Sequence, residues 1–476
     1  MCKSTFLLFV ALCLPLCADG EPLPLTLERA IDRALYANRA IGNAEDTWDR
    51  SQLNVDIECL DLSLKVAPNG QIGFWDGAGN RSKDDNKAKD GLLYGAGLKV
   101  EKKFASGVKV ELNPNFTRLV KYRYESNAAA RVIIPFLRGA GSLTTLSPLQ
   151  TARFDERTKH RDFYLRQVSV VLDVVRAYYN AVKELECMQL AEESYNRFLK
   201  LKQTADARRR AGLIDDVNVY RTQLELRKDE EVFLKAKETY FKAHDRLLDL
   251  LALPIDTPVQ LDRGLVYEEV GMGQEEVVAE ALSNRVEVEQ SYDALQNALR
   301  LARVAHRELL PQLDLAVNYS ICGRGQDLIH SCIRDRTADF KVGFTASTDK
   351  DIGKNRVKYK KSLIDIEVQE RKIEEVRSNI VVEANRVYRS LKRTLLSIDI
   401  QEEQVKTARC ELKAAALRFD RGITDNNFDV VDAERKLHNA QKALLTAVVE
   451  HIIGEYELLQ VMGLLVEKPQ FCVREL

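Results

Sequence analysis

The residues that could carry out chemistry are dispersed along the chain, and no group of them has a catalytic spacing. There is no HExxH pair, no GxSxG turn and no glycine-rich phosphate loop. The nine cysteines include no CxxC and no Cys/His cluster with the spacing of metal ligands. We therefore predict that the protein is not an enzyme and has no catalytic residues, cofactor or metal site. The six histidines are scattered: His160, His244, His306, His330, His438 and His451.

Acidic residues gather at one place, around the segment FDVVDAE. Asp425, Asp429 and Asp432 lie where a helix is predicted to begin. Carboxylates are favoured at helix N-termini because they complement the helix dipole, so one interpretation of these residues is helix capping. A role beyond capping depends on what surrounds the segment.

The segment lies in a stretch that occurs twice. The residues from Gly212 to Leu253 correspond to those from Gly422 onward, about 210 residues later, which is the size of a duplicated half. Apolar residues step by seven in both copies, as on the seam of a coiled coil. His451 falls on this seam, where packing against another helix is the ordinary role and metal ligation the alternative. The two matching sets are Val219, Leu226, Phe233, Tyr240 and Leu247, and Val430, Leu437, Leu444, His451 and Leu458.

A long segment without glycine or proline precedes each copy. These segments, Leu149–Ala211 and Lys354–Arg421, predict helices about 95–100 Å long at about 1.5 Å per residue. Helices of this length need lateral partners to bury their apolar stripes. We expect Gly212 and Gly422 to form the tight turns, in left-handed conformation, that reverse the chain.

The first twenty residues have the pattern of a secretory signal peptide, with Lys3 ahead of an apolar run and small residues at Ala18 and Gly20. Lipidation of Cys17 is an alternative. Thr26 is a suitable N-cap for the first mature helix. No later stretch is apolar for about 18 residues, so we predict no transmembrane helix after the signal. The net charge is −1, and the 30% of charged residues include both signs, so the composition does not indicate the basic surface of a nucleic-acid-binding protein.

Between the helical segments the apolar period changes from 3.6 to 2, which predicts strands within about 59–137 and 312–347. Each strand is either half-buried in a soluble sheet or has lipid on one face and water on the other. Residues 98–112 predict a hairpin that turns at 105–107, and residues 70–90 predict a long exposed loop. Cys322 and Cys332 flank a short loop between two strands and could form a disulfide in an oxidising compartment.

The sequence thus divides into a signal peptide (1–20), a first repeat (21–265, with its turn near 212), a second repeat (266–466, with its turn near 422) and a C-terminal tail (467–476). These ranges follow from the repeat and from the linker after Pro258. Neither half has a sufficient core of its own. We therefore expect one architecture built from two similar halves.

In this order, the segments resemble the TolC family of outer-membrane efflux proteins over about residues 25–465. The resemblance is carried by LTLERAIDRALYANR, IIPFLRGAG, AYYNAVKELE, RRAGLIDDVNVYRTQ, DLLALPIDTPVQL, ALSNRVEVEQ, LARVAHRELLPQLDLAVNYS and RFDRGITDNNFDVVDAE. It implies an α+β membrane protein. Three chains would form an α-helical barrel of long coiled-coil-like helices, continuous with a shared transmembrane β-barrel to which each chain contributes four strands. The hairpin at 98–112 departs from that four-strand pattern.

The resemblance also implies a function. The chain would be the outer-membrane channel of a tripartite efflux pump or type I secretion system, with its helical barrel in the periplasm. Its partners would be two further copies, outer-membrane lipid, a periplasmic adaptor and an inner-membrane transporter that selects the substrate. An exported coiled-coil scaffold without a pore is the alternative, and the alternating strands argue against it.

Two sets of residues take roles from the resemblance. Asp429 and Asp432 match the aspartates that ring the pore at its periplasmic entrance. The turns between the helices match the contacts with the adaptor. The predicted contact residues are Gly212, Leu213, Ile214, Gly422 and Ile423.

Overall fold

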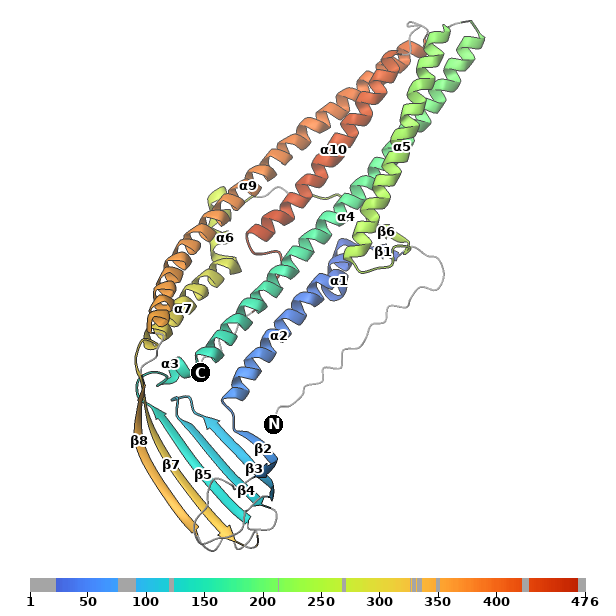
Figure 1. The fold of residues 1–476 in the computed structure, drawn as a ribbon. Coiled ribbons are helices and arrows are strands. Elements are labelled where there is room, and N and C mark those ends of the chain that lie inside the picture. Colours follow the sequence, from blue (N-terminus) through green and yellow to red (C-terminus); the bar gives the residue numbers. More distant parts are fainter. Residues whose placement is uncertain are drawn as a thin grey trace. The chain divides into compact units, whose positions relative to one another are not determined.

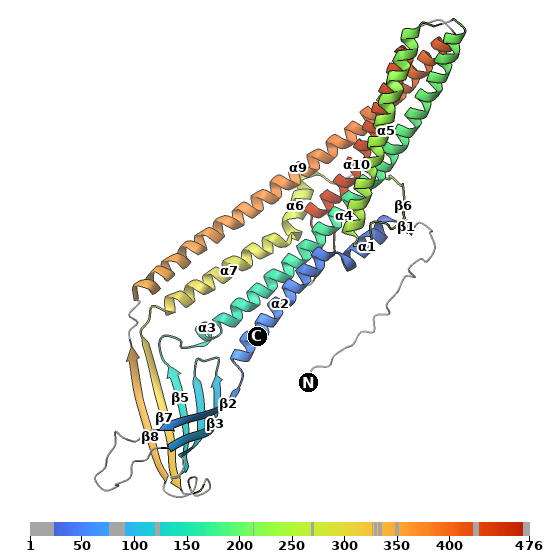
Figure 2. The ribbon, with the colours of Figure 1, turned by 45° about the vertical axis from the view of Figure 1, so that its right-hand side comes forward.

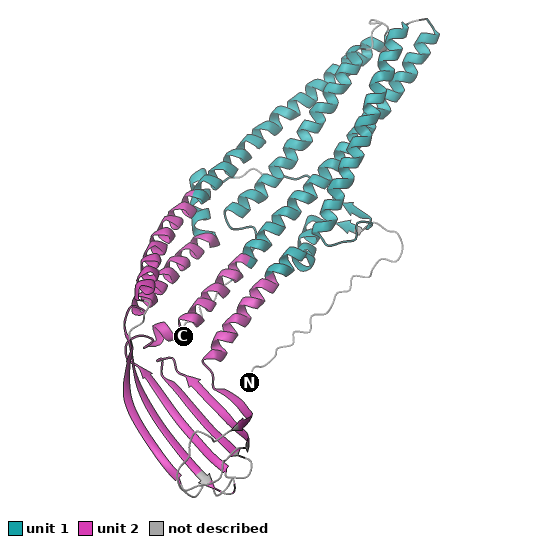
Figure 3. Cartoon of the chain, viewed as in Figure 1, with its two compact units in different colours: residues 1–44, 163–285, 379–472 teal, residues 45–162, 286–378, 473–476 magenta. Residues whose placement is uncertain are grey.

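The computed structural model forms two compact units, and each draws on both sequence repeats (Figure 3). Unit 1 consists of residues 1–44, 163–285 and 379–472, and unit 2 of residues 45–162, 286–378 and 473–476. This division follows compactness in space, so the predicted repeat boundary near residue 265 remains a prediction. The expected signal peptide, residues 1–20, lies outside the described residues. The structure describes residues 23–75, 91–119, 124–212, 214–267, 271–325, 327, 331, 336–347, 352–421 and 428–469.

The helices follow the same order in each repeat (Figure 1). In the first repeat they are α1 (Leu27–Ala37), α2 (Arg39–Asp61), α3 (Ser142–Thr145), α4 (Ser147–Arg210) and α5 (Asp216–Leu250). In the second repeat they are α6 (Gln274–Asn284), α7 (Val286–Arg307), α9 (Ile352–Asp420) and α10 (Phe428–Val461). Among the described residues, no helix is both long and apolar enough to cross a membrane.

The two long helices confirm the prediction made from the glycine-free and proline-free segments. Helix α4 has 64 residues and α9 has 69. Thr26 caps α1 as expected, with its hydroxyl accepting from the backbone N–H of Arg29 at 3.4 Å. The heptad seam is also confirmed, because Val219, Leu247, Val430 and Leu458 are buried.

The core of unit 1 joins α1, α4, α5 and α10 to a small parallel sheet of β1 (Leu23–Leu25) and β6 (Val259–Leu261). The Tyr178 hydroxyl lies 3.1 Å from the carbonyl oxygens of both Leu25 and Asp262, so α4 is tied to both ends of the first repeat. His451 is 1% exposed, with its Nδ1 3.0 Å from the Thr394 hydroxyl on α9. The packing role predicted for this histidine is therefore confirmed.

Unit 2 contains one antiparallel sheet whose described strands number six, in the order β2-β3-β4-β5-β7-β8. The four-strand expectation is therefore wrong for this chain. The strands are β2 (Lys65–Trp75), β3 (Gly91–Lys103), β4 (Lys109–Leu119), β5 (Tyr124–Pro135), β7 (Gln312–Gly325) and β8 (Arg336–Ser347). Within this sheet, the last strand from the first repeat, β5, pairs with the first strand from the second repeat, β7.

Two local expectations change at the start of this sheet. Helix α2 continues to Asp61, so Leu60 is helical although its neighbours alternate. Residues 70–75 belong to β2 and not to an exposed loop, while residues 76–90 lie outside the described residues. The hairpin predicted at 98–112 is confirmed, because β3 and β4 pair across a turn at 104–108.

Candidate functional site

The sheet has one continuous apolar face. Residues paired across an antiparallel ladder point to the same side, so the pairing register sorts every strand into two faces. Only the two ends of this face carry charge, at Lys102 on one end and at Arg118 and Arg336 on the other. Its large side chains include Ile72 and Phe74 on β2, Leu98 and Val100 on β3, Leu112 and Phe116 on β4, Val132 and Ile134 on β5, Leu315, Val317 and Tyr319 on β7, and Phe340, Val342 and Phe344 on β8.

No described helix of unit 2 covers this apolar face. The helices of that unit all lie beyond one end of the strands (Figures 1 and 2). Ile72 is 82% exposed and Phe340 is 67% exposed. A contiguous exposed apolar surface of this size marks an interaction with lipid or another protein. The two charged ends lie beside aromatic rings, with the Arg118 guanidinium 4.7 Å from the ring centre of Tyr124. Such a pairing of aromatic and basic side chains is typical of a membrane interface.

The opposite face of the sheet is polar. Lys99 and Glu101 on β3 form an ion pair at 3.1 Å, and Arg131 on β5 and Lys341 on β8 lie on the same side. Asparagine, glutamine and small residues fill most of the remaining positions. Strands that alternate between an apolar and a polar face in this way can separate lipid from water.

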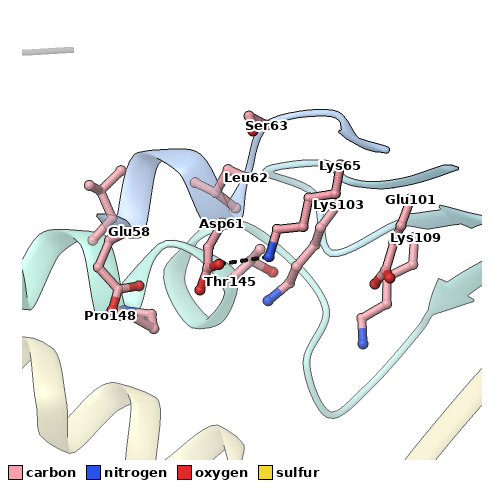
Figure 4. A pocket seen from close by; sticks show the side chains of 11 residues that line it. Glu58, Asp61, Leu62, Ser63, Lys65, Glu101, Lys103, Lys109, Thr145 and Pro148 are labelled. Carbon is pink, nitrogen blue, oxygen red and sulfur yellow. Dashed lines mark hydrogen bonds and ion pairs between the residues drawn. The ribbon is translucent and has the colours of Figure 1, made fainter. Parts of the chain in front are cut away.

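A charged cavity lies where α2 and α4 meet the sheet (Figure 4). Its volume is about 190 Å³, and the Lys65 ammonium lies 2.7 Å from the Asp61 carboxylate on its wall. Lys103 and Lys109, which flank the β3–β4 turn, also line the cavity (Figure 4). Three acidic and three basic side chains line this cavity, so it offers no field of one sign for a charged ligand. We interpret it as the hydrated junction of helices and strands.

In unit 1, the chain reverses between α4 and α5. Gly212 has a φ of +73°, so the prediction of a left-handed turn is confirmed there. Ile214 is half-buried, and the Asp215 carboxylate caps α5 by accepting from the backbone N–H of Asp216. Across the turn, Arg209 and Asp216 form an ion pair at 2.5 Å. The other predicted contact residues, Leu213, Gly422 and Ile423, lie outside the described residues.

The two aspartates singled out in the sequence differ in their surroundings. Asp429 is exposed in the first turn of α10 and has no hydrogen bond or ion pair with the described part of the chain. Asp432 lies 2.9 Å from the Lys436 ammonium, one turn along α10. Lys436 also contacts Glu411 on α9 at 2.7 Å, and these two carboxylates raise its pKa. Asp432 therefore shares one positive charge with Glu411, whereas Asp429 has no basic partner in the described part of the chain.

Two contacts near the reversing turns were not predicted from the sequence. The Arg208 guanidinium donates to the backbone carbonyl of Phe419 at 2.7 Å and stacks 4.1 Å from its ring centre, which joins the ends of α4 and α9. On the other helix pair, Arg221 of α5 lies 5.7 Å from the ring centre of Phe428 on α10. The only sequence signal was a run of three arginines, 208–210, in the last turn of α4, where basic residues favour the helix dipole.

Two buried glutamates, Glu225 and Glu434, form ion pairs that connect the helices near these turns. Glu225 of α5 pairs with Arg435 of α10 and lies 2.9 Å from Lys228. Burial opposes ionisation of Glu225, but hydrogen bonds from Lys228 and Arg435 outweigh it and lower the pKa of Glu225. Glu434 of α10 behaves in the opposite way. Burial raises its pKa although the Arg197 guanidinium of α4 lies 2.8 Å away.

The predicted disulfide remains untested. Cys322 is exposed on β7, while Cys332 lies outside the described residues. Within the described part of the chain, no group of three or more His, Cys, Asp or Glu residues could hold a metal ion.

The comparisons agree with the resemblance noted in the sequence. Residues 277–464 match the family model of the outer membrane efflux proteins. Searched against the curated proteins, the sequence finds no match. The family-model match confirms the resemblance for the second repeat, from α6 to just beyond α10.

Three solved structures show the same fold over most of the chain. They are the Campylobacter jejuni CmeC outer membrane channel (TM-score 0.73, 15% identity, 93% of this chain and 86% of that one), the Vibrio cholerae outer membrane protein VceC (0.71, 13%, 92% and 96%) and the open state of the Neisseria gonorrhoeae MtrE outer membrane channel (0.68, 17%, 92% and 89%). At these identities the likeness establishes the fold. Long paired helices attached to an amphipathic antiparallel sheet are thus an architecture that this chain shares with outer-membrane channels.

Proposed function

We propose that this chain is the outer-membrane channel of a tripartite efflux pump or type I secretion system, a passive conduit from the periplasm to the outside. The observation that carries the proposal is the amphipathic sheet. One face is apolar across all the described strands, the other is polar, and the described helices of unit 2 leave both uncovered. The match of residues 277–464 to the outer membrane efflux proteins supports the same function.

In this proposal three copies assemble around one axis. Each sheet becomes part of a shared β-barrel in the outer membrane, with its apolar face toward lipid and its polar face toward the lumen. The long helices extend from the barrel into the periplasm and pack against those of neighbouring copies. Exposed apolar residues along α5 and α9, such as Leu224, Leu234 and Leu396, suit helix surfaces that become covered on assembly.

The turns near residues 212 and 422 form the periplasmic end of the helical barrel. Asp429 and Asp432 of three copies would place six carboxylates near one axis, a constriction that attracts cations. The same turns, with Gly212, Leu213, Ile214, Gly422 and Ile423, would meet the periplasmic adaptor, which links the channel to an inner-membrane transporter. Energy and substrate choice then come from the transporter, because the channel is a passive duct.

Expression with the signal peptide and fractionation of the membranes test this proposal. We expect the mature protein in the outer membrane, migrating as a trimer without heating and as a monomer after heating. Purified trimers should conduct ions in planar lipid bilayers. A monodisperse soluble monomer would refute the channel and favour a scaffold without a pore.

A further inference from the structure

We infer that the β3–β4 hairpin widens the outer-membrane barrel from twelve strands to eighteen, by adding two strands to each copy and leaving β2 and β8 as the edges that join neighbouring copies. This inference rests on the proposed function. It concerns the size of the exit and the surface on which the copies meet.

The internal repeat identifies the hairpin as an addition. In the second repeat, two described strands, β7 and β8, lie between α7 and α9. In the first repeat, four strands lie between the corresponding helices α2 and α4. Strands β2 and β5 occupy the positions of β7 and β8, so β3 and β4 are the surplus pair.

The added strands are full members of the sheet. Strand β3 pairs with β2 over eleven residues, Lys65↔Glu101 to Trp75↔Gly91, and β4 pairs with β5 from Lys109↔Ile133 to Arg118↔Tyr124. Their apolar residues continue the apolar face without interruption, through Val100 and Leu112. A hairpin that lay across the lumen or projected from the rim would not share both ladders and one apolar face with its neighbours.

The turn of the hairpin is also built into the unit. The carbonyl oxygen of Ser106 accepts from the backbone N–H of Gly141 at 2.9 Å. Gly107 has a φ of +93°, and a Cβ atom there would lie 2.5 Å from the carbonyl oxygen of Gly139. Only glycine fits this close approach, so the turn is locked against the segment that leads from β5 into α4.

The two outer strands are unprotected edges. Every residue of β8 is exposed, as is every residue of β2 from Lys65 to Phe74. Flat edges this long expose backbone donors and acceptors that need a partner, and Pro68 removes only one donor. The partner we infer is a second copy of this chain.

Because the number of described strands is even, β8 of one copy can pair with β2 of the next. Neighbours in the sheet are antiparallel throughout, so β2 and β8 at its ends run in opposite directions. When β8 of one copy meets β2 of the next, the alternation continues and the apolar faces stay on one side. The edges also match in length, with 11 residues in β2 and 12 in β8. Side chains of opposite size can meet there, such as Gly70 with Val342 or Phe74 with Ala338.

The number of strands sets the width. With strands about 4.8 Å apart and tilted by about 40°, a barrel of n strands has a radius of about n Å at its backbone. Three copies of the six described strands give eighteen and a radius of about 18 Å, whereas twelve strands give about 12 Å. The cross-section enclosed by the backbone is thus about 2.2-fold larger. An exit this wide admits bulky, hydrated solutes, so selection must occur elsewhere along the channel.

Cysteine pairs test the edge contact. Ile72→Cys is combined in turn with Ala338→Cys, Phe340→Cys or Val342→Cys, all on the apolar face, and with Lys341→Cys on the polar face as the control. The parent protein, which keeps its own cysteines, reports background cross-links. After mild oxidation of membranes, we expect at least one apolar-face pair to give linked dimers and ring-closed trimers on non-reducing gels. Failure of all three apolar-face pairs would overturn the edge assignment.

A deletion tests the width. Removing residues 91–123 joins β2 to β5 through residues 76–90, and these two strands are antiparallel with their apolar faces on the same side. Neutral polymers are added on the side of the bilayer that faces the strand loops. The deletion variant should exclude polymers that enter the parent, with an entrance cross-section reduced about twofold. Equal exclusion by both heat-stable trimers would refute the widened barrel.

The outcomes separate the two proposals. A parent protein that neither trimerises nor conducts would refute the channel function itself. A conducting parent trimer without β2–β8 cross-links and with the polymer exclusion of a twelve-strand barrel would refute only the role of the hairpin. The cysteine pairs leave all the strands in place, so their result does not depend on whether the deletion variant folds.

Discussion

The contact between Arg208 and Phe419 predicts how firmly the ends of α4 and α9 are held together, and in the proposed channel these ends form the periplasmic tip. The guanidinium of Arg208 donates to the last-turn carbonyl of α9 and stacks on the buried Phe419 ring. A hydrogen bond that involves a charged group contributes about 1.5–3 kcal/mol, and a cation–π contact about 0.5–1 kcal/mol at exposed sites. Arg208 is half-buried. We therefore take about 2 kcal/mol for the loss caused by Arg208→Ala.

That loss shifts the equilibrium between joined and separated ends of α4 and α9. Since every 1.4 kcal/mol changes an equilibrium constant tenfold, the ratio of separated to joined ends should rise about 30-fold in each chain. In planar bilayers, Arg208→Ala should therefore open more often and for longer than the parent. Arg208→Lys keeps the charge but loses the planar stack, so it should be intermediate.

The neighbouring arginine provides the matched control. Arg210 is exposed, and its described contact is a 3.3 Å hydrogen bond from its side chain to the carbonyl oxygen of Asp206 on its own helix. Arg210→Ala removes the same charge from the same turn, so it should open like the parent. If Arg208→Ala forms normal trimers and also opens no more often than Arg210→Ala, the contact does not hold the tip.

Three further predictions concern residues already described. Asp429→Ala should reduce block by divalent cations and cation preference in bilayers more than Asp432→Ala does, because Lys436 partly compensates the charge of Asp432 and nothing described compensates that of Asp429. If even the double variant behaves like the parent, both residues are only caps. Cys322 and Cys332 should form a disulfide, so mass spectrometry of a non-reduced digest should find one linked peptide, and two separately alkylated cysteines would contradict it. Glu225 has a pKa lowered from 4.5, so it stabilises the fold above that pH and the stabilisation is lost as pH falls through the lowered value. Thermal melting of the Glu225→Gln trimer should therefore vary less between neutral and acidic pH than that of the parent, and an equal slope would refute this.

The helical part of the fold was accessible from the sequence because its signals are local. A segment without glycine or proline that is this long has few alternatives to a helix, and a period of seven fixes which side is buried. The limits of α4 and α9 were accordingly found within about two residues. The end of α2 was missed because Leu60 and Leu62 fit both a strand period of two and the end of a helix.

Neither the strand count nor the tip contacts could be predicted from the sequence, and the two reasons differ. The hairpin itself was visible as alternation around Ser106 and Gly107, but an alternating segment does not reveal which strands it will join. Arg208 and the carbonyl of Phe419 are 211 residues apart in the chain. Their meeting depends on the packing of α4 against α9, which no local pattern specifies.

The two repeats show which features of this architecture can vary. Both end their last helix in the same turn, with Ala252 and Gly463 in left-handed conformation and the next residue, Leu253 or Leu464, donating five residues back. A helix that packs in register with the matching helix of the other repeat tolerates little change in length, because a shift would misalign every apolar residue of its heptad seam. The sheet is constrained differently. One added strand would reverse the polarity of an edge, whereas two preserve both polarity and face. A hairpin is therefore the smallest insertion that changes the width of a shared barrel and leaves the joining edges as they were, and this chain carries one such insertion, in its first repeat alone among the described residues.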